Sequence, residues 1–322
     1  MAFEPPENGL PRPAQEAGGM PTYRRRMRRV FFGRQGEIRV GWRLLMATSL
    51  FLVVLTALGA ALGRIPAVHS WLALLRTRGV IKPMVLLFSE GLSVCAVFIS
   101  AFIMARIENR SFAEYGLPTR GAFGKRFWQG AILGFTTLSL LIGGIAALHG
   151  FELGGWALGA GEAVRSGLLY LAAFLLVGLF EEFSFRGYLQ ATLSQGIGFW
   201  PAATILSILF GAVHAPQGGE TRMGAAMAVG YGLFGAFCLK RTGNLWFIIG
   251  EHASWDWAET YFYSVPNSGV TAAGHLLNSS FHGPVWLTGG AAGPEGSVLV
   301  FAVLAVSAGV VHYMFPAKRT AP

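Results

Sequence analysis

Two adjacent carboxylates inside an apolar stretch are the first sign of chemistry in this sequence. Glu181 and Glu182 stand at the end of the uncharged run Ser166 to Phe180, and Arg186 follows in the same segment. Residues four apart share one face of a helix, so Glu182 and Arg186 can form an ion pair. Glu181 is turned away by about 100° and has no local partner. It is therefore the better candidate for a general base, although both acids could also be structural counter-charges.

Two further segments carry imidazole and carboxyl groups. Phe210 and His214 begin and end the sequence FGAVH, and EHASWDW places His252 and Asp256 on one helical face. A single histidine in an apolar helix can be a hydrogen-bonded packing residue. Here, however, three separate segments each contribute titratable groups. Burying so many titratable groups that have no function would cost free energy. The pattern predicts that these side chains face a common cavity.

Two chemistries suit this set of residues. In the first, Glu181 takes a proton from a water molecule that His214 helps to hold, while His252 and Asp256 bind the oxyanion of a peptide carbonyl. In the second, His214, His252 and Glu181 ligate a divalent metal such as zinc, which lowers the pKa of bound water to about 7. The sequence contains no HExxH motif, which excludes the zinc helix of soluble metalloproteases. Metal-free and metal-assisted hydrolysis both stay open.

The segments EEFSFR, FGAVH and HASWD resemble, in order and spacing, the motifs EExxxR, FxxxH and HxxxN/D of the CPBP family. This family comprises intramembrane proteases, among them CAAX prenyl endopeptidases of the Ras-converting type and Abi-like bacteriocin-processing or immunity proteins. The resemblance places the motifs within residues 166–258. It implies an eight-helix membrane fold with a cavity open to the cytosol, and hydrolysis of a peptide bond within or near the bilayer.

The motif match also implies roles for individual residues. Glu181 would activate water with help from His214, and His252 and Asp256 would take the oxyanion or metal positions. Three more motif residues would support the site: Glu182, Arg186 and Phe210. Asp256 stands where many relatives have Asn. An ionised Asp cannot donate to an oxyanion, so Asp256 must be protonated, orient His252 or ligate a metal.

The composition indicates what must position these residues. The chain has 322 residues, of which 53% are hydrophobic and only 13% charged, about half the charge of a soluble domain. We therefore expect an all-α polytopic integral membrane helix bundle of about eight transmembrane helices, with the site in an intramembrane cavity. The expected spans are Leu44–Gly63, Met84–Ala105, Trp128–Leu148, Ser166–Gln190, Trp200–His214, Met223–Leu239, Asn244–Ala258 and Gly296–Phe315.

These spans leave one conflict. Glu181 falls near the inner end of its span, and His214 falls near the outer end of a short one. If both belong to one site, a predicted boundary is wrong, or a helix is tilted or broken. Glu90 interrupts another span and is interpreted as a structural hydrogen-bonding group or a cavity residue. Small-residue pairs that favour close helix packing occur at Gly59/Gly63 and Gly130/Gly134.

Charge distribution predicts the orientation. Residues 1–38 read as a disordered basic cytoplasmic tail without the apolar run of a signal peptide, followed by N-terminal transmembrane helices at 39–160. Residues 161–317 read as the CPBP-like catalytic membrane core with the last helix. Arginines between 24 and 29 precede the first span, and the connection Glu259–Pro294 lacks Lys and Arg. We expect both termini in the cytoplasm of a bacterial inner (plasma) membrane, although the basic residues at 64–82 disagree.

Partners follow from the same observations. The net charge of +9 reports membrane orientation, and no aromatic residues are interleaved with the arginine run, so we expect no nucleic-acid partner. Cys95 and Cys238 lie in apolar spans, which excludes a disulfide framework and a cysteine zinc site. The expected partners are the lipid bilayer and a peptide or protein substrate at the membrane. The alternatives are a non-catalytic immunity or scaffold protein and a proton-coupled transporter.

Overall fold

The chain is predominantly helical. The computed structural model describes residues 30–33, 36–68, 70, 80–216 and 219–316, in which the strands are four two-residue segments. The all-α class is therefore confirmed for the described residues. The basic run at 24–29 and most of the predicted tail lie outside them, as do residues 71–79 and the basic residues near the C-terminus.

Each predicted span corresponds to a helix, although the lengths differ. The helices are α2 (Val40–Gly63), α4 (Pro83–Glu108), α5 (Lys125–Ala147), α6 (Ala160–Glu182), α7 (Gln190–Ile197), α8 (Phe199–His214), α9 (Arg222–Thr242), α10 (Leu245–Trp257) and α12 (Leu299–Met314). Five helical stretches in the described residues are long and apolar enough to cross a membrane, namely α2, α4, α5, α6 joined to α7, and α9. The chain is thus an integral membrane protein. The number of eight spans stays a prediction because α8, α10 and α12 are shorter.

Helix α6 does not stop where the charged residues begin. It continues through the π-helical turn η2 (Phe183–Leu189) into α7, so that one stretch of 38 residues runs from Ala160 to Ile197. Glu181 therefore lies near the middle of a long helical stretch, which is kinked at Gly187, whereas the shorter span predicted from the sequence placed it near an end. The conflict in depth between Glu181 and His214 disappears with this extension. Single π turns inside α-helices occur frequently at functional sites.

Helix α10 lies at the centre of the bundle. It contacts α5, α6 and α9, and all of its residues except Ser254 and Trp257 are buried. Its start is fixed by Asn244, whose side chain accepts a hydrogen bond of 2.8 Å from the backbone N–H of Trp246. The residues that α10 carries are therefore held by helices on several sides.

Glycines let α5 and α10 approach until their backbones touch. A Cβ atom on Gly130 would lie 1.8 Å from the carbonyl oxygen of Phe247, and one on Gly134 would lie 2.1 Å from that of Glu251. The Gly130/Gly134 pair is thus a helix-packing site. Gly59 has open space around it, so the same spacing on α2 serves no comparable contact in the described residues.

We expect Gly130→Val to destabilise the protein strongly, because two branched methyl groups cannot fit between the α5 and α10 backbones. The matched control is Gly59→Val, which adds the same side chain to open space. Thermal unfolding in detergent, followed by size-exclusion chromatography, measures both. Equal unfolding temperatures for the two variants would disprove the close contact.

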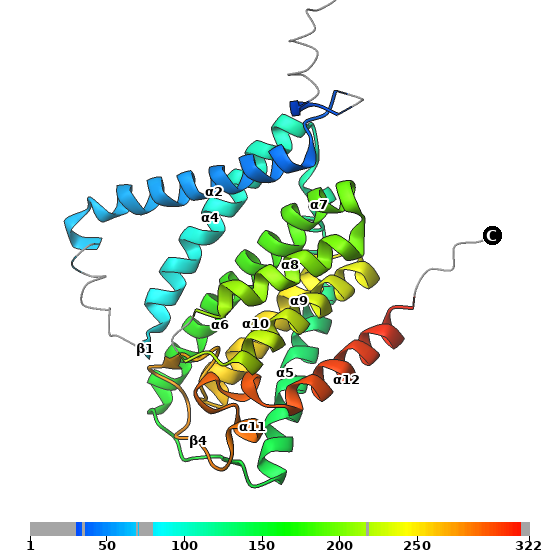
Figure 1. Ribbon diagram of the computed structural model, residues 1–322. Coiled ribbons are helices and arrows are strands. Elements are labelled where there is room, and N and C mark those ends of the chain that lie inside the picture. The colour runs from blue at the N-terminus through cyan, green and yellow to red at the C-terminus, as the bar shows by residue number, and fades with distance from the viewer. Residues whose placement is uncertain (1–29, 34–35, 69, 71–79, 217–218, 317–322) are drawn as a thin grey trace, which may run out of the picture.

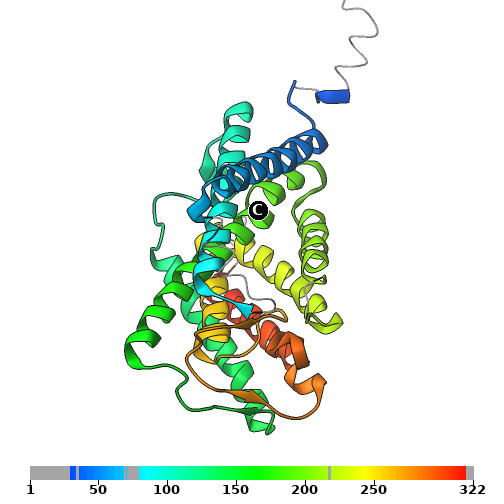
Figure 2. The same ribbon diagram turned by 90° about the vertical axis from the view of Figure 1, so that its left-hand side faces the viewer.

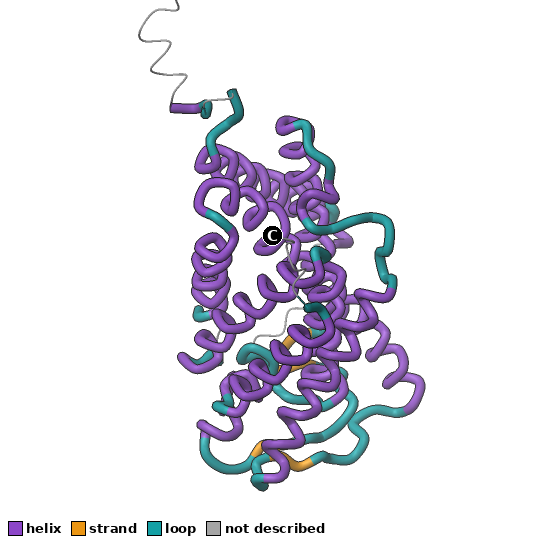
Figure 3. The backbone as a smooth tube through the Cα atoms, turned by 90° about the vertical axis from the view of Figure 1, so that its right-hand side faces the viewer, coloured by secondary structure: helices purple, strands orange, loops and turns teal. Residues whose placement is uncertain are grey.

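A cap of irregular structure covers one end of the bundle (Figures 1 and 3). It consists of residues 258–298, called here the end segment, and includes η3 (Ala258–Phe262), α11 (Val285–Thr288), η4 (Gly290–Ala292) and η5 (Pro294–Gly296). Its strand β3 (Thr271–Ala272) pairs in parallel with β1 (Val80–Ile81), and β4 (Ser280–Phe281) pairs antiparallel with β2 (Phe151–Glu152). The connection that lacks Lys and Arg is therefore packed onto the bundle.

Helix α2 lies at the periphery, beside α4 (Figures 1 and 2). Only Arg43 and Ala47 are buried in it. Arg43 forms an ion pair with Glu108 of α4 and donates a hydrogen bond of 2.7 Å to Gln195 of α7. A polar anchor thus attaches an otherwise lipid-facing helix to the bundle.

Candidate active site

Three helices bring Glu181, His214 and His252 to one point. Nε2 of His214, at the end of α8, lies 3.8 Å from Oε2 of Glu181 on α6. Nε2 of His252 on α10 lies 3.8 Å from the same oxygen. These separations are too long for direct hydrogen bonds, and a bridging water suits a polar gap of this width.

The His214 ring is oriented by its own helix. Its Nδ1 lies 2.7 Å from the backbone carbonyl oxygen of Phe210. Because a carbonyl oxygen only accepts, Nδ1–H must donate, and Nε2 of the neutral ring is left as an acceptor toward Glu181. The Phe210 ring centroid lies 4.4 Å from that of His214 and also 4.4 Å from Cζ of Arg186. Phe210 therefore packs between the arginine and the histidine.

Glu182 serves two partners at once. The predicted contact with Arg186 is present, with Nη1 of Arg186 3.2 Å from Oε1 of Glu182, and both side chains are almost completely buried. The same oxygen accepts a hydrogen bond of 2.9 Å from Nδ1 of His252. The second contact was not anticipated from the sequence. It fixes the ring so that Nε2 of His252 faces Glu181, in the way that carboxylates orient functional histidines.

Asp256 lies one turn beyond His252. Its Oδ2 is 3.6 Å from Nε2 of His252. Nε2 of His252 thus stands between two carboxylates, Glu181 and Asp256. Of the roles left open for Asp256, orientation of His252 is compatible with this distance.

A polar cavity of about 200 Å³ contains these groups. Glu181, His214, His252 and Asp256 line it, and no Lys or Arg does so among the described residues. Three more carboxylates line the same cavity: Glu90, Glu220 and Glu295. Burial raises the pKa of Glu220, and the nearby Glu295 carboxylate acts in the same direction. The cavity is therefore strongly acidic, which disfavours anionic occupants.

A second cavity, of about 450 Å³, lies between α2, α4 and the π turn. Its wall is almost entirely apolar and includes Ala47, Phe51, Val97, Ala101, Phe180 and Leu189. Glu181 and His214 line this cavity as well as the polar one. The two cavities thus meet at the candidate base and its histidine neighbour.

The residues expected for a metal fit it only in part. Histidine nitrogens and a carboxylate are suitable zinc ligands. Among the described residues, however, His214, His252 and Glu181 do not form a set whose ligand atoms all lie within 4.8 Å of one another. The three side chains would have to move closer to share one ion.

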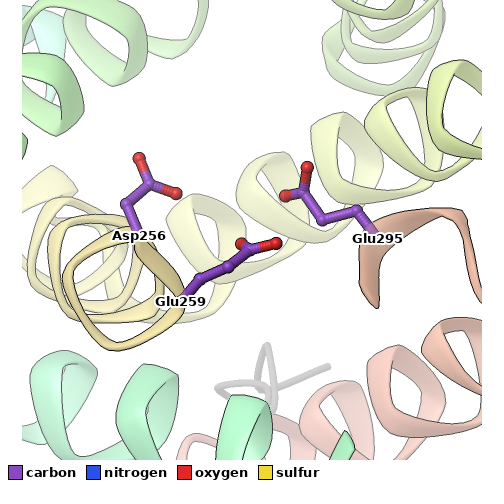
Figure 4. A group of neighbouring side chains, drawn as sticks. All are labelled: Asp256, Glu259 and Glu295. Atoms are coloured by element: carbon purple, nitrogen blue, oxygen red, sulfur yellow. The ribbon is translucent and has the colours of Figure 1, made fainter. Parts of the chain in front are cut away.

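Sequence reasoning missed several acids near the site. In the described part of the chain, one group of three acidic residues has carboxylate oxygens that all lie within 4.8 Å of one another. It consists of Asp256, Glu259 and Glu295 (Figure 4). Glu259 follows Asp256 by three residues, a spacing that could have indicated a shared helical face. Glu295 comes from the end segment and has no such local signal. Glu251, seen in the EHASWDW cluster, accepts a hydrogen bond from the hydroxyl of Tyr231.

Comparison with known proteins gives one finding about family. No curated protein matched the chain. Residues 163–258 match the family described as "Type II CAAX prenyl endopeptidase Rce1-like", and this stretch contains all three motifs. The residues that meet in the polar cavity from α6, α8 and α10 therefore lie in a Rce1-like type II CAAX prenyl endopeptidase domain, as the CPBP resemblance implied.

Proposed function

We propose that this protein is an intramembrane endopeptidase that hydrolyses a peptide bond of a membrane-associated substrate with water activated by Glu181. The observation that carries the proposal is the convergence of Glu181, His214 and His252 from three helices in a buried polar cavity. The family match supports a protease. Protein hydrolysis within a bilayer needs a protein-lined polar space that water can enter.

The proposed steps use the observed geometry. A water molecule between Oε2 of Glu181 and Nε2 of His214 gives a proton to the carboxylate and attacks the peptide carbonyl carbon. His214 holds that water because its Nε2 is an acceptor. In its doubly protonated form, His252 offers an Nε2–H donor to the oxyanion, with Glu182 holding its other nitrogen. Glu181 then returns the proton to the leaving amine.

The two cavities suggest the substrate class. The polar cavity accommodates the peptide near Glu181, and the apolar cavity accommodates a lipid chain or an apolar segment that reaches the same residue. A prenylated CAAX-type protein has both parts. A bacteriocin or leader-like peptide with an apolar segment is the second candidate within the same proposal.

The test is a cleavage assay with purified protein in liposomes. An S-farnesylated CAAX-type peptide and its unmodified form are compared, and we expect faster cleavage of the lipidated peptide. An immunity or scaffold protein would release no product from either peptide, and a transporter would instead show pH-driven solute uptake. Unchanged cleavage after treatment with a zinc-selective chelator, with Ca²⁺ present throughout, supports the metal-free steps, and cleavage lost on this treatment and restored by zinc would overturn them.

We further propose that the protein lies in a bacterial inner membrane with both termini in the cytoplasm. Glu220, which lines the polar cavity, precedes α9, and Lys240 and Arg241 lie in its last turn. A helix of this length separates them by roughly 30 Å. With the basic end in the cytoplasm, Glu220 and the end segment, which line one wall of the polar cavity, lie toward the other side.

Sidedness can be measured with single cysteines. Asn278→Cys lies in the end segment and Arg120→Cys in the loop between α4 and α5, and both positions are exposed. In a background with Cys95 replaced by Ser, we expect a membrane-impermeant maleimide added to intact spheroplasts to label Asn278→Cys and not Arg120→Cys. The reverse pattern would place the end segment on the cytoplasmic side.

A further inference from the structure

Three acidic side chains outside the proposed catalytic steps converge beside the polar cavity. Asp256 and Glu259 leave the same helical stretch at the end of α10, and Glu295 reaches toward them from η5 (Figure 4). One carboxylate oxygen from each lies within 4.8 Å of the others. Glu259 is completely buried, and Asp256 is 6% exposed. We refer to these residues as the acidic triad.

Neighbouring donors hold two of the carboxylates in place. The indole N–H of Trp255 donates to Oε2 of Glu259 at 3.1 Å. The backbone N–H and the hydroxyl of Ser268 donate to Oε2 of Glu295 at 3.1 and 2.8 Å. Such outer contacts orient the ligands of metal sites. Each bond engages one oxygen of its carboxylate.

Two buried oxygens at this place have no hydrogen-bond partner among the described residues: Oε1 of Glu259 and Oγ1 of Thr260. Thr260 is not one of the triad, is 2% exposed, and lines the polar cavity together with Asp256 and Glu295. Buried polar atoms without a partner are costly and rare. Both atoms can act as ligands of a cation.

The surrounding charges do not neutralise the triad. No Lys or Arg lines the cavity in the described part of the chain. His252, 3.6 Å from Asp256, is also hydrogen-bonded to Glu182. Three carboxylates at such short range require a positive ion or bound protons.

We propose that Asp256, Glu259 and Glu295, with the Thr260 hydroxyl, bind a hard divalent cation of the Ca²⁺ class, at a site distinct from Glu181 and His214. Only oxygen donors are present, which matches the preference of Ca²⁺ and Mg²⁺ and disfavours softer metals. Bonds of about 2.3–2.6 Å let Ca²⁺ join oxygens almost 5 Å apart, whereas Mg²⁺ requires a tighter octahedron.

Such a cation would have two effects on the protein. It would join η3, which follows α10, to η5, which precedes α12, and so fix a wall of the polar cavity. It would also neutralise Asp256 next to His252.

Trp255 provides a direct readout, because its indole contacts Glu259 and can sensitise the luminescence of a lanthanide bound there. The purified full chain is titrated with Tb³⁺, and emission is recorded under tryptophan excitation. We expect saturable emission that Ca²⁺ displaces. Glu259→Gln and Glu295→Gln should each weaken Tb³⁺ binding at least about tenfold, while Glu90→Gln, another cavity carboxylate, leaves it unchanged.

Further variants separate this site from the proposed catalytic one. Tb³⁺ binding retained in Glu181→Gln and His214→Ala supports a distinct site, whatever their effect on cleavage. Binding lost in His214→Ala and kept in Glu259→Gln would overturn the proposal. Because the triad variants could fail to fold, the wild-type protein and Trp255→Phe are also heated with and without Ca²⁺. We expect a higher unfolding temperature with Ca²⁺ in both, and no shift in the wild-type protein would overturn the proposal.

Discussion

Glu181→Gln is expected to lower peptide cleavage by at least about a hundredfold while the protein still folds and inserts. General bases contribute about 10²–10⁴-fold to rates, and glutamine keeps the shape of the side chain without its capacity to take a proton. Glu181 is 22% exposed and contacts His214 and His252 at 3.8 Å without a direct hydrogen bond. Its loss should therefore leave the helix packing unchanged.

The comparison needs a control with the same chemical change in the same cavity. Glu90→Gln and Glu181→Gln both replace a carboxylate that lines the polar cavity, but only Glu181 lies beside the two histidines. Cleavage is measured by mass spectrometry of the products, and unfolding temperatures are measured in parallel. Wild-type cleavage by Glu181→Gln, or an equal loss in both variants, would argue against Glu181 as the base.

Arg186→Met is expected to produce the largest loss of stability. It removes the cation from a pair in which Glu182 is 0% and Arg186 2% exposed. Removing one partner of a buried ion pair costs about 3–5 kcal/mol, and here the hydrogen bond from His252 stays. The Phe210 ring also loses its contact with the guanidinium. Because Glu182 holds His252 through Nδ1, we expect cleavage to fall as well.

A double variant separates charge from packing. Glu182→Gln/Arg186→Met removes both charges, so it should recover much of the stability lost in Arg186→Met. Cleavage should stay low, because glutamine does not replace the carboxylate that holds His252. Thermal unfolding and cleavage are measured on all three proteins. A double variant no more stable than Arg186→Met would show that the lost cation is not the cause.

Local spacing explains what could be predicted from the sequence. The Glu182–Arg186 pair and the stacking of His252 and Asp256 follow from four-residue spacing on a helix, and both contacts are present. Long apolar runs were sufficient to predict an all-α membrane protein. The sequence contains the Gly130/Gly134 spacing that favours helix packing, but it does not show that α10 is the helix packed against these glycines.

Contacts between distant segments could not be derived in this way. The hydrogen bond from His252 to Glu182 depends on how α10 is rotated against α6. The π turn shifts the register of the helix after Glu182. The spacing of apolar residues in the sequence does not predict this turn. Glu295 joins Asp256 and Glu259 only because the end segment folds back over the bundle.

The most direct test of hydrolysis by water activated at Glu181 uses isotopic oxygen. Purified protein in liposomes is incubated with the S-farnesylated CAAX-type peptide in H₂¹⁸O, and the new carboxyl group is analysed by mass spectrometry. We predict one ¹⁸O atom in the product of a single turnover, no product with Glu181→Gln, and normal product with Glu90→Gln. Product formed by Glu181→Gln at the wild-type rate, or wild-type product without ¹⁸O, would contradict the proposed function.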